Sequence, residues 1–257
     1  MAVRPRPPAE QAFGDDADGE LMAHGEADLR HWADGGMACE PRDMGLHAAM
    51  SETGSGPQVT LYWLPLGAGG RLVRRCGRLY EEISARRHHR APLGLVHAAL
   101  EIAVDGSRFT VEVGPGWNVH APDRGVVQTG PVGLRPLGRS VLFRYEVRCW
   151  RDGVIPDLGE AAGAERVSTD ATRARRVLEL TRSVPALTWG RDELRAGDMW
   201  NSNSVSVAAW LLACSGHEAR GMQPPNGLRA PGWRAGLELA RRQRATAKDQ
   251  DPLTEVP

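Results

Sequence analysis

Lysine is almost absent from this chain of 257 residues, because Lys248 is the only lysine among 32 basic residues. Arginine carries nearly all of the positive charge. Together with abundant Ala, Gly and Pro, this bias is typical of a GC-rich bacterial genome and indicates no function. An excess of charge of either sign is also missing, because 32 acidic residues balance the basic ones. The whole-chain charge therefore gives no support to a nucleic-acid partner.

The chain also lacks paired cysteines and long apolar runs. Its four cysteines form no C-x-x-C pair and have no metal-ligand spacing, so we expect neither a metal nor a cofactor. No apolar run reaches roughly 18 residues, which excludes a transmembrane helix, and the first residues lack the apolar region of a secretory signal. We therefore expect a cytoplasmic protein with reduced thiols. These cysteines are Cys39, Cys76, Cys149 and Cys214.

Composition divides the chain into three parts. Residues 1–57 are rich in Gly, Asp, Ala and Pro without periodicity, and we expect a disordered or flexible arm. Met50 opens a stretch typical of a protein start, so residues 1–49 either precede the natural start or form a genuine arm. The 41% hydrophobic content supports one domain, which we expect at 58–233 with an α+β fold. A basic helix and tail should follow at 234–257, with the helix at 235–244 exposed to solvent.

Alternating and helical patterns predict the order of the elements. We expect strands at 59–64, 95–104, 109–113, 126–128 and 141–150. A helix should begin after a cap at Asp170 and run to about Thr181. Another helix over 72–87 would pack one apolar face against the core. That face would consist of Leu72, Cys76, Leu79 and Ile83. A loop after residue 214 holds Trp233, which should dock on the domain.

The strand at 95–104 separates apolar from titratable side chains. Its even-numbered residues from 96 onward are all apolar, whereas His97 and Glu101 lie on the opposite face. Asp-Gly at 105–106 is a hairpin signal, so the strand at 109–113 should return antiparallel to it.

The length of the hairpin loop decides which side chains meet. A two-residue loop would pair Val104 with Ser107 and would set Glu112 diagonally beside His97, at about 7–8 Å between backbones. A four-residue loop would pair Glu101 with Glu112 instead and would move Glu112 one step away. In both cases the face that carries His97 also holds a carboxylate.

The stretch 198–214 organises the rest of the chain. Its second part, 205–214, is apolar on nearly every side, which predicts a buried helix that ends before Gly216. The start of such a helix presents unpaired N–H groups and partial positive charge, where a nucleophile or an anionic ligand could lie. A redundant cap followed by a polar loop is the simpler interpretation. Four small polar residues open the helix although one cap would suffice, namely Asn201, Ser202, Asn203 and Ser204.

The order of these pieces resembles the circularly permuted papain-like fold, particularly lecithin–retinol acyltransferase-like and related permuted peptidase domains. Those domains carry a strand His, a second His or polar residue on the next strand, and an Asn-Cys-x-x-aromatic motif that opens a helix. Here His97 matches the first position, Glu112 falls at the second, and residues 201–204 fall on the third. The resemblance covers about residues 59–215. It implies an antiparallel sheet packed on the buried central helix. The chain also resembles uncharacterised actinobacterial proteins.

One departure from the family pattern concerns the nucleophile, because Ser202 stands where a Cys is expected. A helix N-terminus lowers the pKa of a thiol, but a serine hydroxyl needs an adjacent general base. The resemblance implies His97 in that role, oriented by Glu112 in a Ser–His–Glu arrangement. The helix start, with Asn201 and Asn203 on either side of the serine, would bind an oxyanion through backbone N–H groups.

Two functions fit this arrangement. The first is a hydrolase or acyltransferase that acts on an amide, ester or thioester bond of a small-molecule, peptide or lipid substrate. It would use Ser202, His97 and Glu112. The second is a non-catalytic binding or scaffolding protein on the same fold, which the missing cysteine favours. A distance of about 3–4 Å between the His97 ring and Ser202 Oγ would support the enzyme.

Overall fold

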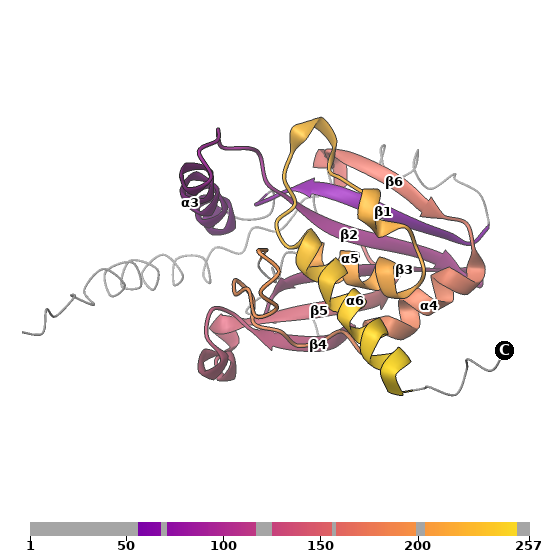
Figure 1. The fold of residues 1–257 in the computed structure, drawn as a ribbon. Coiled ribbons are helices and arrows are strands. Elements are labelled where there is room, and N and C mark those ends of the chain that lie inside the picture. Colours follow the sequence, from indigo (N-terminus) through magenta and orange to yellow (C-terminus); the bar gives the residue numbers. More distant parts are fainter. Residues whose placement is uncertain (1–55, 68–70, 117–124, 156–157, 199–203, 251–257) are drawn as a thin grey trace, which may run out of the picture. The chain divides into compact units, whose positions relative to one another are not determined.

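A computed structural model describes residues 56–67, 71–116, 125–155, 158–198 and 204–250, without the side chains of 71–73 and 248–250. The strands form one antiparallel sheet in the order β4-β5-β3-β2-β1-β6 (Figure 1). The predicted α+β class and antiparallel sheet are therefore confirmed, and the expected edge strand is β4. The strands are β1 (Gln58–Pro65), β2 (Val96–Val104), β3 (Ser107–Pro115), β4 (Val126–Pro131), β5 (Arg144–Arg151) and β6 (Gly163–Ser168).

Two parts of the sheet differ from the sequence prediction. Strand β6 was not expected, because its sequence GAERVS has no alternating apolar pattern, yet it pairs with β1 at the sheet edge. The strand predicted at 141–150 begins three residues later, since Val141–Phe143 forms a 3-10 turn. Its inward residues Tyr145 and Val147 are buried as expected.

The hairpin between β2 and β3 has the two-residue loop. Val104 lies opposite Ser107, and the loop residues Asp105 and Gly106 both have positive φ angles of 53° and 68°. Positive φ at both positions is the requirement of a type I′ turn. The Asp105 carboxylate also accepts hydrogen bonds from Arg175 at 2.6 and 2.9 Å, which ties the hairpin to helix α4.

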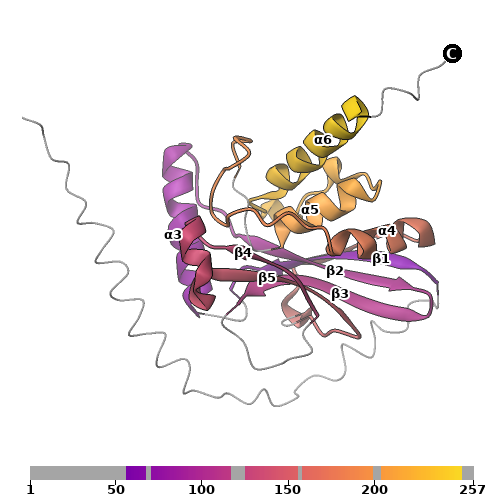
Figure 2. The ribbon, with the colours of Figure 1, turned by 90° about the horizontal axis from the view of Figure 1, so that it is seen from below.

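Helices α4 (Ala171–Thr181), α5 (Val205–Cys214) and α6 (Trp233–Gln250) lie on one face of the sheet (Figure 2). Helix α3 (Arg71–Arg87) lies apart from them (Figure 1). Asp170 caps α4 as predicted, accepting from the Thr172 and Arg173 N–H groups at 2.7 and 3.2 Å. No helix in the described ranges is long and apolar enough to span a membrane. The short 3-10 turns are η1 (Arg135–Arg139), η2 (Val141–Phe143), η3 (Leu158–Glu160), η4 (Ala219–Gly221) and η5 (Pro225–Gly227).

Helix α5 is buried between the sheet and α6, as its sequence predicts. Every residue from Val205 to Ala213 is buried, in one cluster with the inward residues of β1, β2, β3 and β5. On its outer side α6 approaches at Gly236, where an added Cβ would lie 2.2 Å from the Ser206 carbonyl oxygen and 2.9 Å from Ala209 Cβ. This glycine therefore permits the two helices to pack closely.

The prediction of a solvent-exposed helix at 235–244 is wrong, because α6 buries Ala235, Leu239 and Ala240. The many arginines of this helix lie on its outer face, and they led the prediction to overlook the apolar residues on its inner face. The expected docking of Trp233 is confirmed. Its ring lies 5.0 Å from that of Trp63 in β1, and its Nε1–H donates to the Ala219 carbonyl at 3.0 Å.

The sheet face opposite α5 has a smaller apolar cluster. It joins side chains of β1 and β2 to the segment that follows β5, with Leu158 and Ala161 packed against it. The buried members are Tyr62, Leu64, Ala99 and Ile155. Because side chains alternate along a strand, Ala99 marks this face of β2 and Ala98 marks the face that packs on α5.

Helix α3 forms as predicted, but its apolar face is not in the core. Cys76 is exposed, and Leu79 and Ile83 are 47% and 53% exposed. The side chain of Leu72, the fourth predicted core residue, lies outside those described. The residues that α3 buries are Glu81, Ser84 and Ala85.

Candidate functional site

The start of α5 makes a direct hydrogen bond to strand β2. Ser204, in the left-handed conformation with φ 58°, accepts at its Oγ from the Ala98 N–H at 3.1 Å. The pairing of β2 with β3 ends at Leu100 and Val111, so Ala98 lies where the two strands have separated. The Ser204 side chain therefore binds a backbone group of β2 that β3 no longer pairs. We call this place, defined by Ser204, Ala98 and the last pair Leu100–Val111, the strand split.

His97 is the neighbour of Ala98 and lies at the strand split. It is half-buried, and by alternation its side chain lies on the face of Ala99, opposite the face that packs on α5. Burial lowers the pKa of His97 to about 4, so the imidazole is neutral at pH 7.

Glu112 lies on β3 just beyond the last β2–β3 pair. Because side chains alternate along a strand, Glu112 lies on the same sheet face as Ala99 and His97. On its other side Glu112 lies opposite Arg148 of β5. Arg148 itself donates to Glu146 at 3.1 Å, so this face carries an ion pair beside Glu112.

The nucleophile predicted from the sequence lies outside the described residues. Ser202, with Asn201 and Asn203, belongs to the segment 199–203 that precedes Ser204. The structure thus places the backbone of His97 and the start of α5 at the strand split, with the His97 and Glu112 side chains on the sheet face opposite α5. The contact of His97 with Ser202 stays a prediction.

Asp198 has a structural role that was not predicted from the sequence. Its carboxylate accepts from the Gly232 N–H at 2.9 Å and the Arg234 N–H at 3.1 Å, which caps the start of α6 from a distant segment. Burial raises the pKa of Asp198 despite these hydrogen bonds. The sequence gives one indication of this cap. Pro231-Gly232 precedes α6 and has no side chain that can accept a hydrogen bond, so the first N–H groups of α6 need an acceptor from another segment.

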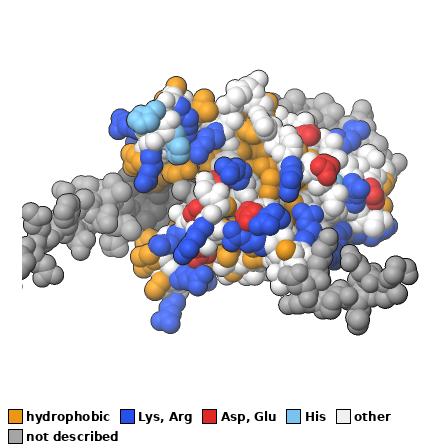
Figure 3. All heavy atoms as spheres, viewed as in Figure 1, with side chains coloured by type: hydrophobic (Ala, Val, Ile, Leu, Met, Phe, Trp, Pro, Cys, Tyr) orange, Lys and Arg blue, Asp and Glu red, His pale blue; other side chains and the backbone are white. Residues whose placement is uncertain are grey.

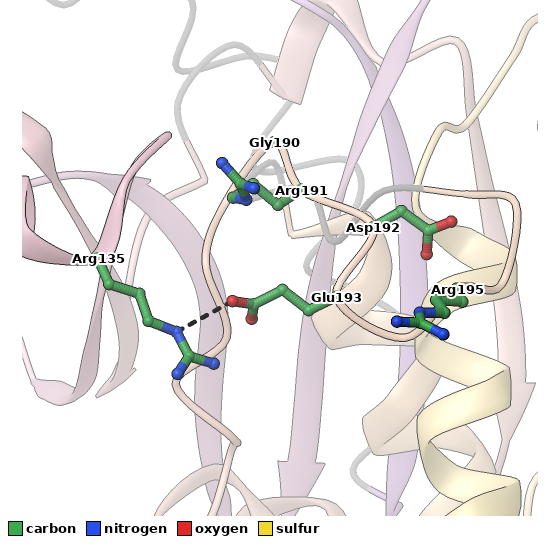
Figure 4. Close-up of a pocket in the computed structure, with 6 residues that line it drawn as sticks. All are labelled: Arg135, Gly190, Arg191, Asp192, Glu193 and Arg195. Atoms are coloured by element: carbon green, nitrogen blue, oxygen red, sulfur yellow. Dashed lines mark hydrogen bonds and ion pairs between the residues drawn. The ribbon is translucent and has the colours of Figure 1, made fainter.

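Two surface hollows among the described residues are lined by arginines. One, of about 630 Å³, lies beside a loop that carries Arg191 and Arg195, and there Arg135 pairs with Glu193 at 3.1 Å (Figure 4). The other, of about 1020 Å³, lies along α6 and includes buried His217. Guanidinium groups bind anions but supply neither a nucleophile nor a general base. Neither hollow is lined by His97 or Glu112.

The balanced net charge conceals an uneven distribution along the chain. Residues 1–55 hold eleven acidic and four basic residues, which leaves 28 basic and 21 acidic residues for 56–257. Figure 3 shows basic side chains over α3 and α6. A charge count for each segment would have revealed the excess of basic residues in 56–257, which the whole-chain total conceals.

The three described cysteines differ in their surroundings. Burial raises the pKa of the Cys149 thiol, and the same cause raises that of Cys214, so both are poor nucleophiles. Cys76 differs from its prediction as a core residue, since it is exposed on α3. Among the residues that the structure describes, no group of three or more His, Cys, Asp or Glu side chains could hold a metal ion.

Comparisons of the chain with protein-family models, with curated proteins and with solved structures found no match.

Proposed function

We propose that the protein is a hydrolase or acyltransferase of permuted papain-like architecture that acts on an amide, ester or thioester bond at the strand split. The observation that carries this proposal is the 3.1 Å hydrogen bond from the Ala98 N–H to Ser204 Oγ. It joins the start of the buried helix α5 to the residue next to His97, where β2 and β3 have separated. The nucleophile of this proposal, Ser202, precedes Ser204 by two residues.

In this proposal His97 acts as the general base. Its neutral ring nitrogen takes the Ser202 Oγ proton while Oγ bonds to the carbonyl carbon of the substrate. The carbonyl π electrons move to oxygen, and the N–H groups at the helix start bind that oxyanion. Its collapse expels the leaving group, which takes the proton from the His97 imidazolium. Water then hydrolyses the acyl-serine, or a second acceptor removes the acyl group.

Glu112 has the supporting role. A carboxylate on the same sheet face stabilises the imidazolium that forms when His97 takes the proton, and it holds the ring in one orientation. This contribution is needed here because burial holds the pKa of His97 near 4, well below the pH at which a general base is most effective.

A serine-directed fluorophosphonate probe tests the enzyme directly. We expect labelling of the full chain that disappears in Ser202→Ala, falls sharply in His97→Ala and falls less in Glu112→Gln. Ser168→Ala is the matched control, since this serine ends β6 opposite Val59, four positions along β1 from Trp63, the partner of Ala98. Equal labelling of the wild type and all four variants, or none in any of them, would remove the enzyme from consideration.

A non-catalytic binding or scaffolding protein on the same fold is the second candidate. The specific observation in its favour is that the His97 side chain lies on the sheet face opposite the one that packs on α5. The discriminating variant is Ser202→Cys, measured by iodoacetamide alkylation rate. The enzyme requires this thiol to react faster than exposed Cys76, because a helix start and an adjacent imidazole lower a thiol's pKa. A rate no higher than that of Cys76 supports the binding protein.

A further inference from the structure

Among its described side chains, helix α3 exposes its larger apolar ones to solvent and buries Glu81, Ser84 and Ala85. We define the outward stripe as Cys76, Leu79 and Ile83, which follow one another at spacings of three and four residues. On a helix these positions lie along one line on the same side. The buried residues Glu81 and Ser84 lie on the opposite side of the helix. An amphipathic helix that has docked by its apolar face would show the reverse arrangement.

An ion-pair cluster holds the inward side of α3, beside buried Ala85 and the Leu66 side chain that lies against Gly77. Glu81 is 2% exposed, and its carboxylate accepts from Arg90 at 2.5 Å and from Arg229 at 2.7 Å. It also accepts from the Leu93 N–H at 2.9 Å, and Arg229 donates to Ser84 Oγ at 3.0 Å. Turning α3 to bury the outward stripe would break these contacts and leave Glu81 without its cations. The exposure of the stripe is therefore a fixed property of the fold.

Arginines lie along one side of the outward stripe. Five of them are exposed on the same helix, and one glutamate, Glu82, is exposed beside them. The other glutamate of the helix, Glu81, is already neutralised by Arg90 and Arg229. Figure 3 shows this mixture of basic and apolar side chains over α3. Arg75, Arg78 and Arg86 lie on one side of the stripe, Arg87 continues its row, and Arg74 lies on the side of Glu81.

We propose that the outward stripe of α3 docks an acidic amphipathic helix of a partner protein. The spacing of three and four residues is that of a seam between two helices, in which each apolar side chain packs between those of the partner. Glutamates or aspartates beside the partner's apolar row complement the arginines on that side of the stripe. A second copy of this chain has the wrong charge, because two α3 helices would bring the arginines together. A membrane-binding helix has a wider apolar face than this narrow row.

The test uses the full chain and a fluorescein-labelled synthetic peptide of about four heptads, with leucine at the a and d positions and glutamate at e and g. We expect saturable binding by fluorescence anisotropy that weakens as salt rises. The double variant Leu79→Ser/Ile83→Ser should lose at least about tenfold in affinity. Arg75→Glu/Arg78→Glu should lose a similar factor, because it reverses the charge on one flank of the stripe.

The matched control is Leu134→Ser, since Leu134 is 51% exposed and lies before η1, away from α3. It should bind the peptide as the wild type does. All variants change exposed side chains, and circular dichroism and unchanged thermal unfolding will show that they fold. Absence of peptide binding, or equal binding by wild type and Leu79→Ser/Ile83→Ser, overturns the proposal.

Two further outcomes identify other occupants and also overturn the proposal. If vesicles of phosphatidylserine and phosphatidylcholine bind the chain through the same residues while the peptide does not, the stripe meets a lipid surface. If light scattering shows a dimer that Leu79→Ser/Ile83→Ser abolishes, a second copy covers it. Because no readout involves catalysis, the result is independent of the enzyme proposed at the strand split.

Discussion

The Ala98 N–H donates a hydrogen bond of 3.1 Å to Ser204 Oγ, which joins the start of α5 to the sheet. These two residues are separated by 106 positions in the chain. Because Ala98 lies beyond the last β2–β3 pair, its N–H needs this hydroxyl as an acceptor.

Replacing Ser204 by Ala should therefore cost about 1–3 kcal/mol of unfolding free energy, the usual penalty for a buried donor left without its acceptor. Urea unfolding of the purified variant measures this. Ser140→Ala is the control, since that hydroxyl bonds Leu142 N–H at 3.4 Å in an exposed turn. A loss for Ser204→Ala no larger than for Ser140→Ala would show that the bond contributes nothing.

His97 should make stability depend on pH in the mildly acidic range. Burial lowers its pKa from 6.5 to about 4, so between these values the unfolded chain binds a proton that the folded chain does not. The contribution of neutral His97 to the unfolding free energy is therefore fully present above about pH 6.5 and decreases as pH falls toward 4. His97→Gln should flatten this part of the curve. An NMR titration that gave His97 a pKa of 6.5 or above would contradict the expectation.

Glu81 should make stability decrease at lower pH. Although burial raises the pKa of this carboxyl, hydrogen bonds from Arg90, the Leu93 N–H and Arg229 outweigh it and hold the pKa at about 2. A carboxyl whose pKa is lower in the folded than in the unfolded chain stabilises the fold at any pH above the unfolded pKa, here about 4.5. This stabilisation is lost as pH falls toward 2. The shift corresponds to roughly 3 kcal/mol. We expect Glu81→Gln to lose this stabilisation at neutral pH and to show a smaller dependence of unfolding free energy on pH below 4.5. Glu82→Gln, at an exposed side chain, is the control.

Gly236 should not tolerate a methyl group. Alanine normally improves a helix by about 1 kcal/mol over glycine, but here its Cβ would meet the Ser206 carbonyl of α5 at 2.2 Å. We expect Gly236→Ala to destabilise by about 1–3 kcal/mol, as overpacking does. Gly221→Ala, with nothing within 4 Å of its added Cβ, should be close to neutral. Thermal unfolding of the two variants decides the question, and a stabilised Gly236→Ala would mean that α5 and α6 are further apart.

The interior of α5 should respond strongly to truncation. Leu212 is fully buried, and Trp210 is buried with its Nε1–H donating to Gln243 of α6 at 2.7 Å. Leu212→Ala and Trp210→Ala should each cost about 2–5 kcal/mol by denaturant unfolding. Val154→Ala, at a side chain 61% exposed, should cost less than about 0.5 kcal/mol. Losses under about 1 kcal/mol for both core variants would place α5 at the surface.

Local signals predicted the parts of the fold that depend on neighbouring residues. The Asp105-Gly106 dipeptide predicted the hairpin, although a loop of two or of four residues was compatible with it. Asp170 marked the start of α4, and the apolar run at 205–214 predicted the buried helix. Strand β6 was missed because an exposed edge strand needs no apolar alternation.

Long-range contacts explain what the sequence could not predict. The orientation of α3 depends on the pair of Glu81 with Arg229, which are 148 positions apart. The start of α6 depends on Asp198, 34 positions before Gly232. At the candidate site the sequence selected His97 and Glu112 for a shared face, and the observed register agrees. The face on which α5 packs depends on tertiary structure and was not predictable from alternation alone.

The packing of α6 over α5 has a consequence during synthesis. Chains leave the ribosome from the N-terminus at about 5–20 residues per second. The 36 residues from Cys214 to the end of α6 at Gln250 therefore take several seconds to be made. Until α6 has docked, a helix that is apolar on nearly all sides has the sheet strands on one side and no cover on the other. The nascent chain is then a substrate for chaperones and open to association with other chains. A ribosome that stops before α6 would release a product in which this exposure is permanent.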